Sequence, residues 1–401
     1  MTKEEGQSPV VMLNSFQHLI RFSLPLVDTP FIPVHRTGFS GAISNKRVGE
    51  KRWLAVKIAL YYSKANMYEA MFYKKDKGTT VQCLLCPREC VISDGKRGFC
   101  RNRENRGGTL YTLVYGRPAV VDIGPIEKAP LYHFIPGHFR LCLTCASCNL
   151  RCRHCQNWYL SQKSFEELNH HSYSPLEIVQ QAKKQVLNSI SFTYTEPTVY
   201  YEYLYDISSI ARQMGMKTSI VSNGYINREP LLKLLTVLDA VKIDLKGFHE
   251  AFYEEICSAT LKPVLESLLT VKKENVWLEI VNLVIPTLND DPKMIDEMCR
   301  WIKGNLGVDT PLHFTRFSPN YKLTHLSPTP ISTLESTYEI AKKNGLRYVY
   351  IGNVPGHIHN STFCPFCNLK VIHRTHFDVL EMNVVNGKCK FCNASIQGKW
   401  T

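Results

Sequence analysis

Two patterns of hydrophobic and polar positions alternate from about residue 139 to residue 353. Amphipathic segments with apolar residues at helical spacing separate most of the short strand-like runs in this region. A repeated strand–helix alternation predicts a parallel sheet with crossover helices. We therefore expect an α/β fold, a full or partial (β/α) barrel, with functional residues at the carboxyl ends of its strands. The seven predicted strands lie in "RLCLT", "SISFTYT", "KTSIVSN", "AVKIDLK", "VWLEIVNLVI", "LHFTRF" and "RYVYIGN".

The clearest helix start in this region lies at Ser174. Pro175 occupies the first helical position, and Glu177 follows the cap by three residues, which is the pattern of a capping box. The residues predicted to line the buried face of this helix are Leu176, Val179, Ala182 and Val186.

The predicted barrel, residues 139–353, is flanked by segments of different composition. Residues 1–66 lack a sustained apolar period and contain no cysteine, which predicts an extension without stable structure. A second hypothesis is that Met67 is the authentic start of the protein. Residues 67–138 form a cysteine-bearing module. Residues 354–401 contain two CxxC pairs and little material for a core, which predicts a small module stabilised by metal.

Charge and cysteine content narrow the class of protein. The formal net charge of +13 is diffuse, because no block of five consecutive Lys or Arg occurs; it permits an acidic, phosphate or nucleic-acid partner. The chain contains no run of 18 apolar residues, so no membrane-spanning helix is expected. Polar residues interrupt the apolar stretch near the N-terminus, so no secretory signal is expected either. A cytoplasmic location follows as the expectation. In a reducing compartment, the 15 cysteines predict metal binding or catalysis rather than disulfides.

Three cysteines follow the first predicted strand with the spacing C-x3-C-x2-C. Thiolates from Cys148, Cys152 and Cys155 can hold three irons of a 4Fe–4S cluster and leave the fourth iron open. An open iron suits a chelating substrate or cofactor, as an open position does in catalytic zinc sites. A zinc knuckle is the alternative.

Four other cysteines stand apart from this group. Cys142 and Cys145 form a CxxC pair immediately upstream and are predicted to be free thiols on or near the first strand, with metal binding as the alternative. Cys257 and Cys299 are isolated in predicted helices, which indicates unreactive buried thiols.

Sequence stretches along most of the chain resemble a known family. From about Met67 to Trp400 the chain resembles the radical S-adenosylmethionine (SAM) enzyme of the AmmeMemoRadiSam system, which is related to the pyruvate formate-lyase activating enzymes. The resemblance implies that the open iron binds SAM and that one-electron reduction yields a 5′-deoxyadenosyl radical, which abstracts hydrogen from a substrate. It also implies an electron donor such as flavodoxin or ferredoxin, and a protein, peptide or small-molecule substrate. The matching stretches include "CLLCPREC", "GPIEKAPLYHFIPG", "CNLRCRHCQNW", "FTYTEPT", "VSNGYI", "DAVKIDLKGF" and "YVYIGNVPGH".

The resemblance assigns roles at the ends of the second and third strands. It implies that Glu196 accepts hydrogen bonds from the SAM ammonium, with a carboxylate at a helix N-terminus as the alternative. It implies that Ser222 and Asn223 contact the ribose or the carboxylate, with ordinary turn chemistry as the alternative. The chain departs from the family before the first cluster cysteine, where Thr144 and Ser147 replace the usual glycines.

Further residues are assigned from the fourth strand and the cysteine loop. Asp244 and Lys246 lie two apart on one side of a strand and resemble the pair near the SAM ribose and carboxylate; a strand-end salt bridge is the alternative. His154 occupies the position of an aromatic residue near adenine, where an imidazole can also stack. His313 is expected to point toward the barrel mouth.

The two flanking modules are predicted to bind metal. The C-terminal pairs have the spacing of a zinc ribbon, with an auxiliary iron–sulfur cluster as the alternative; they are Cys364, Cys367, Cys389 and Cys392. The N-terminal set indicates a closed site that holds zinc or an auxiliary cluster, with free thiols as the alternative; it consists of Cys83, Cys86, Cys90 and Cys100. Besides the radical SAM function, the alternative is a non-catalytic zinc or iron–sulfur protein that binds nucleic acid through its basic surface.

Overall fold

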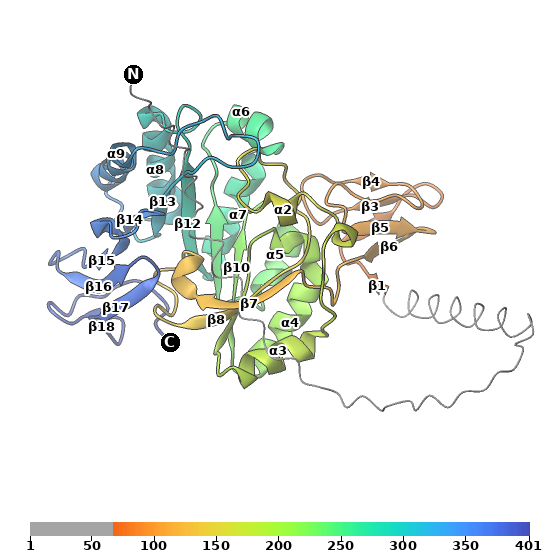
Figure 1. The fold of residues 1–401 in the computed structure, drawn as a ribbon, viewed down its shortest axis with the longest axis horizontal. Helices are drawn as coiled ribbons and strands as arrows, with labels where there is room; N and C mark the ends of the chain where they lie inside the picture. The colour runs from red at the N-terminus through yellow and green to blue at the C-terminus, as the bar shows by residue number, and fades with distance from the viewer. Residues whose placement is uncertain (1–66) are drawn as a thin grey trace, which may run out of the picture. The chain divides into compact units, whose positions relative to one another are not determined.

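The computed structural model describes residues 67–401, so the expectations for residues 1–66 lie outside the described range. The central element is an eight-stranded sheet (Figure 1) with the order β14-β13-β12-β11-β10-β9-β8-β7. Neighbours are parallel except for β7, which runs antiparallel to β8. The strands are β7 Val120–Pro125, β8 Phe139–Thr144, β9 Ser189–Phe192, β10 Lys217–Ser222, β11 Ala240–Asp244, β12 Trp277–Val284, β13 Leu312–Arg316 and β14 Val349–Gly352.

This sheet confirms the predicted fold class. Each of the seven predicted strands coincides with one of β8 to β14. Strands β7 and β14 are its two edges, so the barrel is open rather than closed. The antiparallel strand β7 was not predicted, and it lies within the segment assigned to the N-terminal module.

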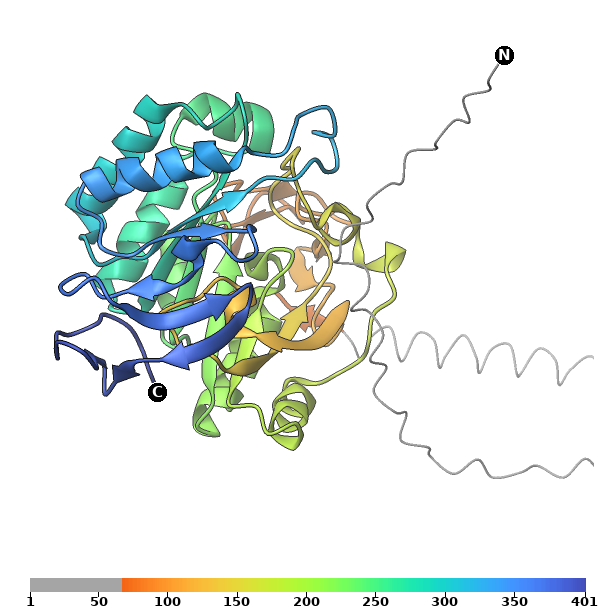
Figure 2. The ribbon, with the colours of Figure 1, turned by 60° about the vertical axis from the view of Figure 1, so that its left-hand side comes forward.

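Helices cover the outer face of the sheet (Figures 1 and 2). Helix α4 packs against β9 and β10, α7 against β12, and α9 against β13 and β14. Apolar strand residues such as Val241, Ile280 and Phe314 form the core with these helices. The helices are α2 Trp158–Ser161, α3 Pro175–Lys184, α4 Tyr201–Gln213, α5 Arg228–Leu235, α6 Glu250–Phe252, α7 Lys262–Lys273, α8 Pro292–Leu306 and α9 Ile331–Lys343.

Helix α3 starts as predicted but buries a different face. The Ser174 side chain accepts from the Glu177 amide, and the Glu177 carboxylate accepts from the Ser174 amide, which completes the capping box. Leu176, however, is 46% exposed, and Val186 is 87% exposed. Val186 lies beyond the last helical residue with a φ of 58°, so it leaves the helical pattern altogether. The buried residues are Ile178, Val179 and Ala182.

The inner face of the sheet is polar, and a hydrophobic segment closes one end of it. Lys242 on β11 lies in register beside Glu279 on β12, and both side chains are buried. Residues 126–138, between β7 and β8, pack apolar side chains such as Phe134 against Ala240. Ala240 is the first residue of β11, so this segment fills the amino end of the barrel and leaves the carboxyl end for the site.

The N-terminal module consists of two three-stranded antiparallel sheets attached to the barrel. The backbone amide of Asn227 donates to the carbonyl oxygen of Leu85 (3.1 Å), and the Met71 amide donates to Glu202 (2.7 Å). Arg103 and Glu202 form an ion pair that is 1% exposed on each side. The strands are β1 Tyr68–Glu69, β2 Tyr73–Lys75, β3 Val81–Cys83, β4 Val91–Ile92, β5 Arg103–Arg106 and β6 Thr109–Thr112.

The C-terminal module packs against the closed end of the barrel, near β14 (Figure 2). Arg374 is fully buried and donates to the carbonyl oxygen of Tyr132 (2.7 Å). The amide of Ile135 donates to the carbonyl oxygen of Lys399 (2.7 Å). The module is therefore part of the seal at the amino end. Its strands are β15 Thr362–Phe363, β16 Lys370–Thr375, β17 Asp378–Met382, β18 Val384–Val385 and β19 Lys388–Cys389.

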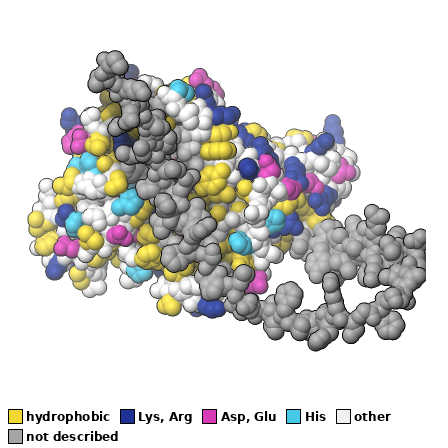
Figure 3. All heavy atoms as spheres, in the orientation of Figure 1, with side chains coloured by type: hydrophobic (Ala, Val, Ile, Leu, Met, Phe, Trp, Pro, Cys, Tyr) yellow, Lys and Arg dark blue, Asp and Glu magenta, His cyan; other side chains and the backbone are white. Residues whose placement is uncertain are grey.

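The surface of the described residues gives two further observations. None of the helices between residues 67 and 401 combines the length and apolarity needed to cross a bilayer. On the face drawn in Figure 3, basic side chains are interspersed with acidic and apolar ones. On that face the positive charge is therefore spread out rather than concentrated in one basic patch.

Candidate functional site

The three-cysteine loop leaves the carboxyl end of β8 and is anchored by backbone hydrogen bonds. The amide of Arg151 donates to the carbonyl oxygen of Cys257 (3.0 Å), and the amide of Arg153 donates to that of Ile256 (2.8 Å). Both acceptors lie in a π-helical turn, Tyr253–Cys257. Such turns are rare and frequent at functional sites. The loop is therefore fixed by a second element before any metal binds.

The sulfur atoms of this loop suit an iron–sulfur cluster. The Sγ of Cys148 accepts from the Leu150 amide (3.3 Å) and the Asn223 side-chain amide (3.6 Å), and the Sγ of Cys155 lies 3.1 Å from the Ser161 hydroxyl. Burial raises the pKa of Cys148 well above its ordinary value, so its thiolate needs a cation. Within residues 67–401, no three of these sulfurs fall within 4.8 Å of one another. The loop therefore lacks the compact arrangement that a single ion imposes, and each of its three thiolates can bind a different iron.

Ser147 keeps a backbone conformation that favours glycine, although the chain departs from glycine at this position. Ser147 has a φ of 74°, in the left-handed region that favours glycine. Its side chain is fully buried, and its hydroxyl oxygen has no hydrogen-bond partner. Serine adopts this conformation less readily than glycine, and the resulting backbone strain costs about 1 kcal/mol.

Glu196 lies at the end of β9, fully buried, and its carboxylate is largely occupied by protein donors. Its Oε1 accepts from the amide and hydroxyl of Thr198 (3.0 and 2.7 Å) and from the Ser222 hydroxyl (2.8 Å). Its Oε2 accepts from the Asn223 amide (2.8 Å). Burial raises the pKa of Glu196, and these hydrogen bonds oppose that rise. The residue also caps the short helix Pro197–Tyr200, as the alternative interpretation of Glu196 expected.

Ser222 and Asn223 form a turn at the end of β10 that reaches the cysteine loop. The Ser222 hydroxyl accepts from the Gly224 amide (3.0 Å), and the Asn223 Oδ1 accepts from the Tyr225 amide (2.8 Å), which is turn chemistry. The Asn223 Nδ2 also donates to Asn149 Oδ1 (2.9 Å) and to Cys148. The structure therefore joins Glu196, Ser222, Asn223 and Cys148 in one hydrogen-bonded group.

Asp244 lies between two lysines at the end of β11. Its carboxylate bonds to the ammonium of Lys242 and lies 3.3 Å from that of Lys246. Burial opposes ionisation of Asp244, but the two ammonium groups outweigh it and hold its pKa at about 2. The Asp244–Lys246 contact is the strand-end salt bridge that the alternative interpretation expected. Lys242 was missed, although the spacing of "KIDLK" places all three side chains on one face.

His154 is buried inside the cysteine loop and is uncharged. Burial and the nearby Lys246 lower its pKa to about 3. Its Nδ1 has no hydrogen-bond partner, and its ring centroid lies 6.3 Å from that of Phe252. A neutral imidazole with an unpaired nitrogen can stack on an adenine ring and bond to it.

His313 does not point toward the barrel mouth. It is the second residue of β13, near the amino end, and its Nε2 lies 2.8 Å from the buried Glu279 carboxylate. Glu279 also accepts from the amides of Tyr132 and His133 (2.9 and 2.8 Å). The prediction was wrong because strand alternation gives the face of a residue but not its depth in the barrel.

The four cysteines outside the metal groups are all buried. Cys142 lies on β8, and the Arg140 guanidinium donates to its sulfur (2.7 Å). Cys257 lies beside Cys152, and a hydrogen bond between the two free thiols is the main cause that raises the pKa of Cys152. Cysteine spacing could not predict that Cys257 lies beside Cys152, because the two residues are distant in the sequence.

The C-terminal cysteines form a compact four-sulfur group. The Sγ atoms of Cys364 and Cys392 are 3.6 Å apart, and those of Cys367 and Cys389 are 3.7 Å apart. All four lie within 4.8 Å of one another. Four thiolates at about 2.3 Å from one tetrahedral zinc ion lie about 3.8 Å apart. The group therefore fits a single metal ion held by a ribbon.

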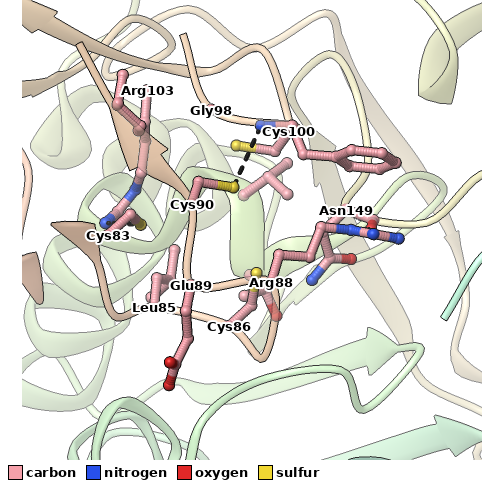
Figure 4. A pocket seen from close by; sticks show the side chains of 14 residues that line it. Cys83, Leu85, Cys86, Arg88, Glu89, Cys90, Gly98, Cys100, Arg103 and Asn149 are labelled. Atoms are coloured by element: carbon pink, nitrogen blue, oxygen red, sulfur yellow. Dashed lines mark hydrogen bonds between the residues drawn. The ribbon is translucent and has the colours of Figure 1, made fainter. Parts of the chain in front are cut away.

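The N-terminal cysteines face a common cavity (Figure 4), which the side chains of Asn149 and Arg88 also line. The amide of Phe99 donates to the Sγ of Cys90 (3.4 Å), and the Arg103 guanidinium donates to that of Cys83 (3.5 Å). No three of the four sulfurs lie within 4.8 Å of one another among the described residues. These thiols are thus gathered around one space without the compactness of the C-terminal group.

Known proteins match this chain along most of its length. The model of the radical SAM superfamily matches residues 143–302. An uncharacterised protein of Methanocaldococcus jannaschii is 47% identical over 332 residues, which are 82% of this chain and 99% of that protein.

Activating enzymes are among the more distant similarities. The pyruvate formate-lyase-activating enzyme of Clostridium pasteurianum is 27% identical over 173 residues, which are 40% of this chain and 68% of that enzyme. The crystal structure of a domain of such an enzyme from Bacteroides vulgatus covers 41% of this chain and 98% of its own, at 18% identity and a TM-score of 0.36. On the family match and the 47% identical relative, the chain belongs to the radical SAM superfamily.

Proposed function

We propose that the chain holds a 4Fe–4S cluster on Cys148, Cys152 and Cys155 and uses SAM to abstract hydrogen from a protein or peptide. The observation that carries this proposal is the contact between two strand ends. Asn223, at the end of β10, reaches the Sγ of Cys148 (3.6 Å), at the end of β8. When bound, the cluster and SAM together supply a 5′-deoxyadenosyl radical after one-electron reduction.

The residues around the cysteine loop have separate tasks in this proposal. Asp244 stays ionised down to about pH 2 and binds and orients the polar end of SAM, with Lys246 at its side. The ammonium group of Lys242 pairs with the Asp244 carboxylate and keeps it ionised. Neutral His154 stacks with adenine. Glu196 is a positioning residue, because its protein hydrogen bonds hold Ser222 and Asn223 in place.

The substrate class rests on the relatives. Activating enzymes are among the similar proteins, which supports a protein or peptide substrate and a reductant such as flavodoxin or ferredoxin. Within the superfamily we place the chain with the radical SAM enzymes of the AmmeMemoRadiSam system. We also propose zinc in the C-terminal ribbon and a cytoplasmic location, which suits a protein with free thiols. The nucleic-acid-binding alternative receives no support from the relatives.

Electron paramagnetic resonance (EPR) of the anaerobically reconstituted, reduced protein tests the open coordination site. The g values of its signal should shift when SAM is added, because SAM binds an iron that lacks a protein ligand. A signal that ignores saturating SAM would indicate a cluster with four protein ligands and would contradict the proposal. The matched control is Cys299→Ser, which removes a buried cysteine of α8 far from the loop in sequence.

A further inference from the structure

We propose that Cys83, Cys86, Cys90 and Cys100 hold a second iron–sulfur cluster, through which electrons reach the cluster on the loop of Cys148. The identity of this site does not depend on the function proposed above, but its role as a relay does. The donor is a low-potential one-electron carrier such as a reduced flavodoxin. For each electron that enters the chain, one carrier is oxidised by one electron and the loop cluster is reduced by one.

The sulfur atoms of the N-terminal set are not gathered as they are around one ion in the ribbon, which favours a cluster over zinc. The C-terminal group of the same chain shows the arrangement of thiolates around one ion, with all four sulfurs within 4.8 Å of one another. In the N-terminal set, no three sulfurs meet that limit, and the same holds for the loop of Cys148 among the described residues. Thiolates of a cubane bind different irons and must stand further apart than those around one ion. The N-terminal set and the loop therefore both lack the compact arrangement of the ribbon.

The surroundings of the four thiols suit a cluster that changes charge. The sulfurs face a cavity between the module and the barrel, lined mostly by apolar atoms (Figure 4). The Phe99 amide donates to Cys90, and Arg103, which is 1% exposed, donates to Cys83. Hydrogen bonds to cluster sulfurs favour the reduced, more negative state of an iron–sulfur cluster. An electron-transfer site needs that state to be accessible.

Two arginines connect this site to the loop of Cys148. Arg151 donates through Nη1 to the carbonyl oxygen of Cys148 (2.7 Å) and through Nη2 to that of Phe99 (2.6 Å). One guanidinium with its two hydrogen bonds spans no more than about 8 Å. The backbones that carry Cys148 and Cys100 are therefore neighbours.

The second arginine strengthens this connection. Arg88 lies between Cys86 and Cys90 in the sequence and donates to the carbonyl oxygen of Asn149 (2.6 Å). The Asn149 side chain lines the cavity of the four thiols and follows Cys148 directly. Only Asn149 would then separate a cluster in that cavity from Cys148. Electron transfer between two clusters requires such proximity.

The metal content of the triple variant C148A/C152A/C155A tests the site itself. After anaerobic reconstitution, the variant should keep about four irons and about four sulfides per chain. It should also keep about one zinc ion in the ribbon. A variant with two zinc ions and no iron would overturn the assignment of the N-terminal site and leave the function of the loop untouched.

The complementary variant C86S/C90S should reduce the iron content from about eight to about four per chain, whereas C299S should keep the wild-type content. If C86S/C90S does not fold, the triple variant still decides the question. If the function of the loop fails instead, the wild type should hold only about four irons, all retained in the triple variant, and form no 5′-deoxyadenosine.

The relay is tested by EPR of the fully reduced wild type. Two paramagnetic clusters on neighbouring loops should broaden each other's signals, and this broadening should vanish in the triple variant. The ratio of SAM cleavage with reduced flavodoxin to that with dithionite should fall about ten-fold or more in C86S/C90S. A wild-type spectrum equal to the sum of two unbroadened signals, or an unchanged ratio, would overturn the relay.

Discussion

Asn223 donates its side-chain amide to the sulfur of Cys148 over 3.6 Å. Its backbone amide donates to Glu196 (2.8 Å), so one residue connects the end of β9, the end of β10 and the cysteine loop. A thiolate at this position gains an N–H donor without any movement of the backbone. The contact ties the polar strand ends to the proposed cluster.

Replacement of Asn223 by Ala should lower the reduction potential of the loop cluster. The lost hydrogen bond to Cys148 stabilises the reduced state by about 1 kcal/mol, which corresponds to about 40 mV for one electron. A redox titration followed by EPR measures the shift. The exposed Asn305→Ala in α8 is the control, and equal potentials in the two variants would contradict the assigned contact.

Substitutions at Ser147 should separate backbone strain from side-chain loss. Both Ser147→Gly and Ser147→Ala remove the unpaired hydroxyl, but only glycine adopts a φ of 74° without strain. The free energy of unfolding of the Ala variant should therefore lie about 1 kcal/mol below that of the Gly variant. Denaturant unfolding under anaerobic conditions measures this difference. An Ala variant at least as stable as the Gly variant would be inconsistent with the strained turn.

Buried His133 should make the protein less stable as the pH falls. Burial lowers its pKa from 6.5 to about 4, so the unfolded chain binds the proton first and stability falls between about pH 6.5 and pH 4. Between pH 7 and pH 5 this residue alone should remove about 2 kcal/mol. In His133→Gln that fraction of the pH dependence should be absent. The same slope of unfolding free energy against pH in both proteins would refute the assignment.

Replacing only Asp244 of the Lys242–Asp244 pair should destabilise the fold more than replacing both residues. Asp244→Asn leaves the buried Lys242 ammonium without its counter-ion and should destabilise the fold by about 2 kcal/mol or more. The double variant K242M/D244N removes the charge as well and should recover part of that loss. Unfolding measurements on the two single variants and the double variant complete the cycle. Strictly additive losses would mean that the two side chains do not interact.

Removal of the C-terminal metal should loosen one module only. Cys389→Ser breaks the four-sulfur group and should abolish zinc binding while the iron content stays at the wild-type level. Hydrogen exchange should rise in residues 362–396, and β9 to β12 should keep their protection. Retained zinc in this variant would contradict the four-thiol site.

The strands and the metal groups could be predicted from the sequence because each depends on local spacing. The strand–helix alternation located β8 to β14, and the CxxC pairs located the ribbon that the four sulfurs form. The depth of a side chain in the barrel and contacts between distant residues have no comparable pattern in the sequence. His313 has the spacing of an inward residue, yet its position in β13 places it with Glu279 at the closed end.

Two residues make tertiary contacts that their sequence context did not indicate. Cys257 is unremarkable in its own segment and becomes a neighbour of Cys152 only because the π-helical turn supports the cysteine loop. Glu196 has the sequence context of a ligand contact, but the fold surrounds its carboxylate with protein donors. Pattern and spacing do not reveal how many protein donors surround a carboxylate.

Formation of 5′-deoxyadenosine tests the central claim most directly. Anaerobically reconstituted protein is incubated with SAM and dithionite, and the products are separated by chromatography. We predict 5′-deoxyadenosine with the wild type and with Cys299→Ser, and none with Cys152→Ala. Absence of the product from wild-type protein with an intact cluster, or its formation by Cys152→Ala at the wild-type rate, would contradict the account.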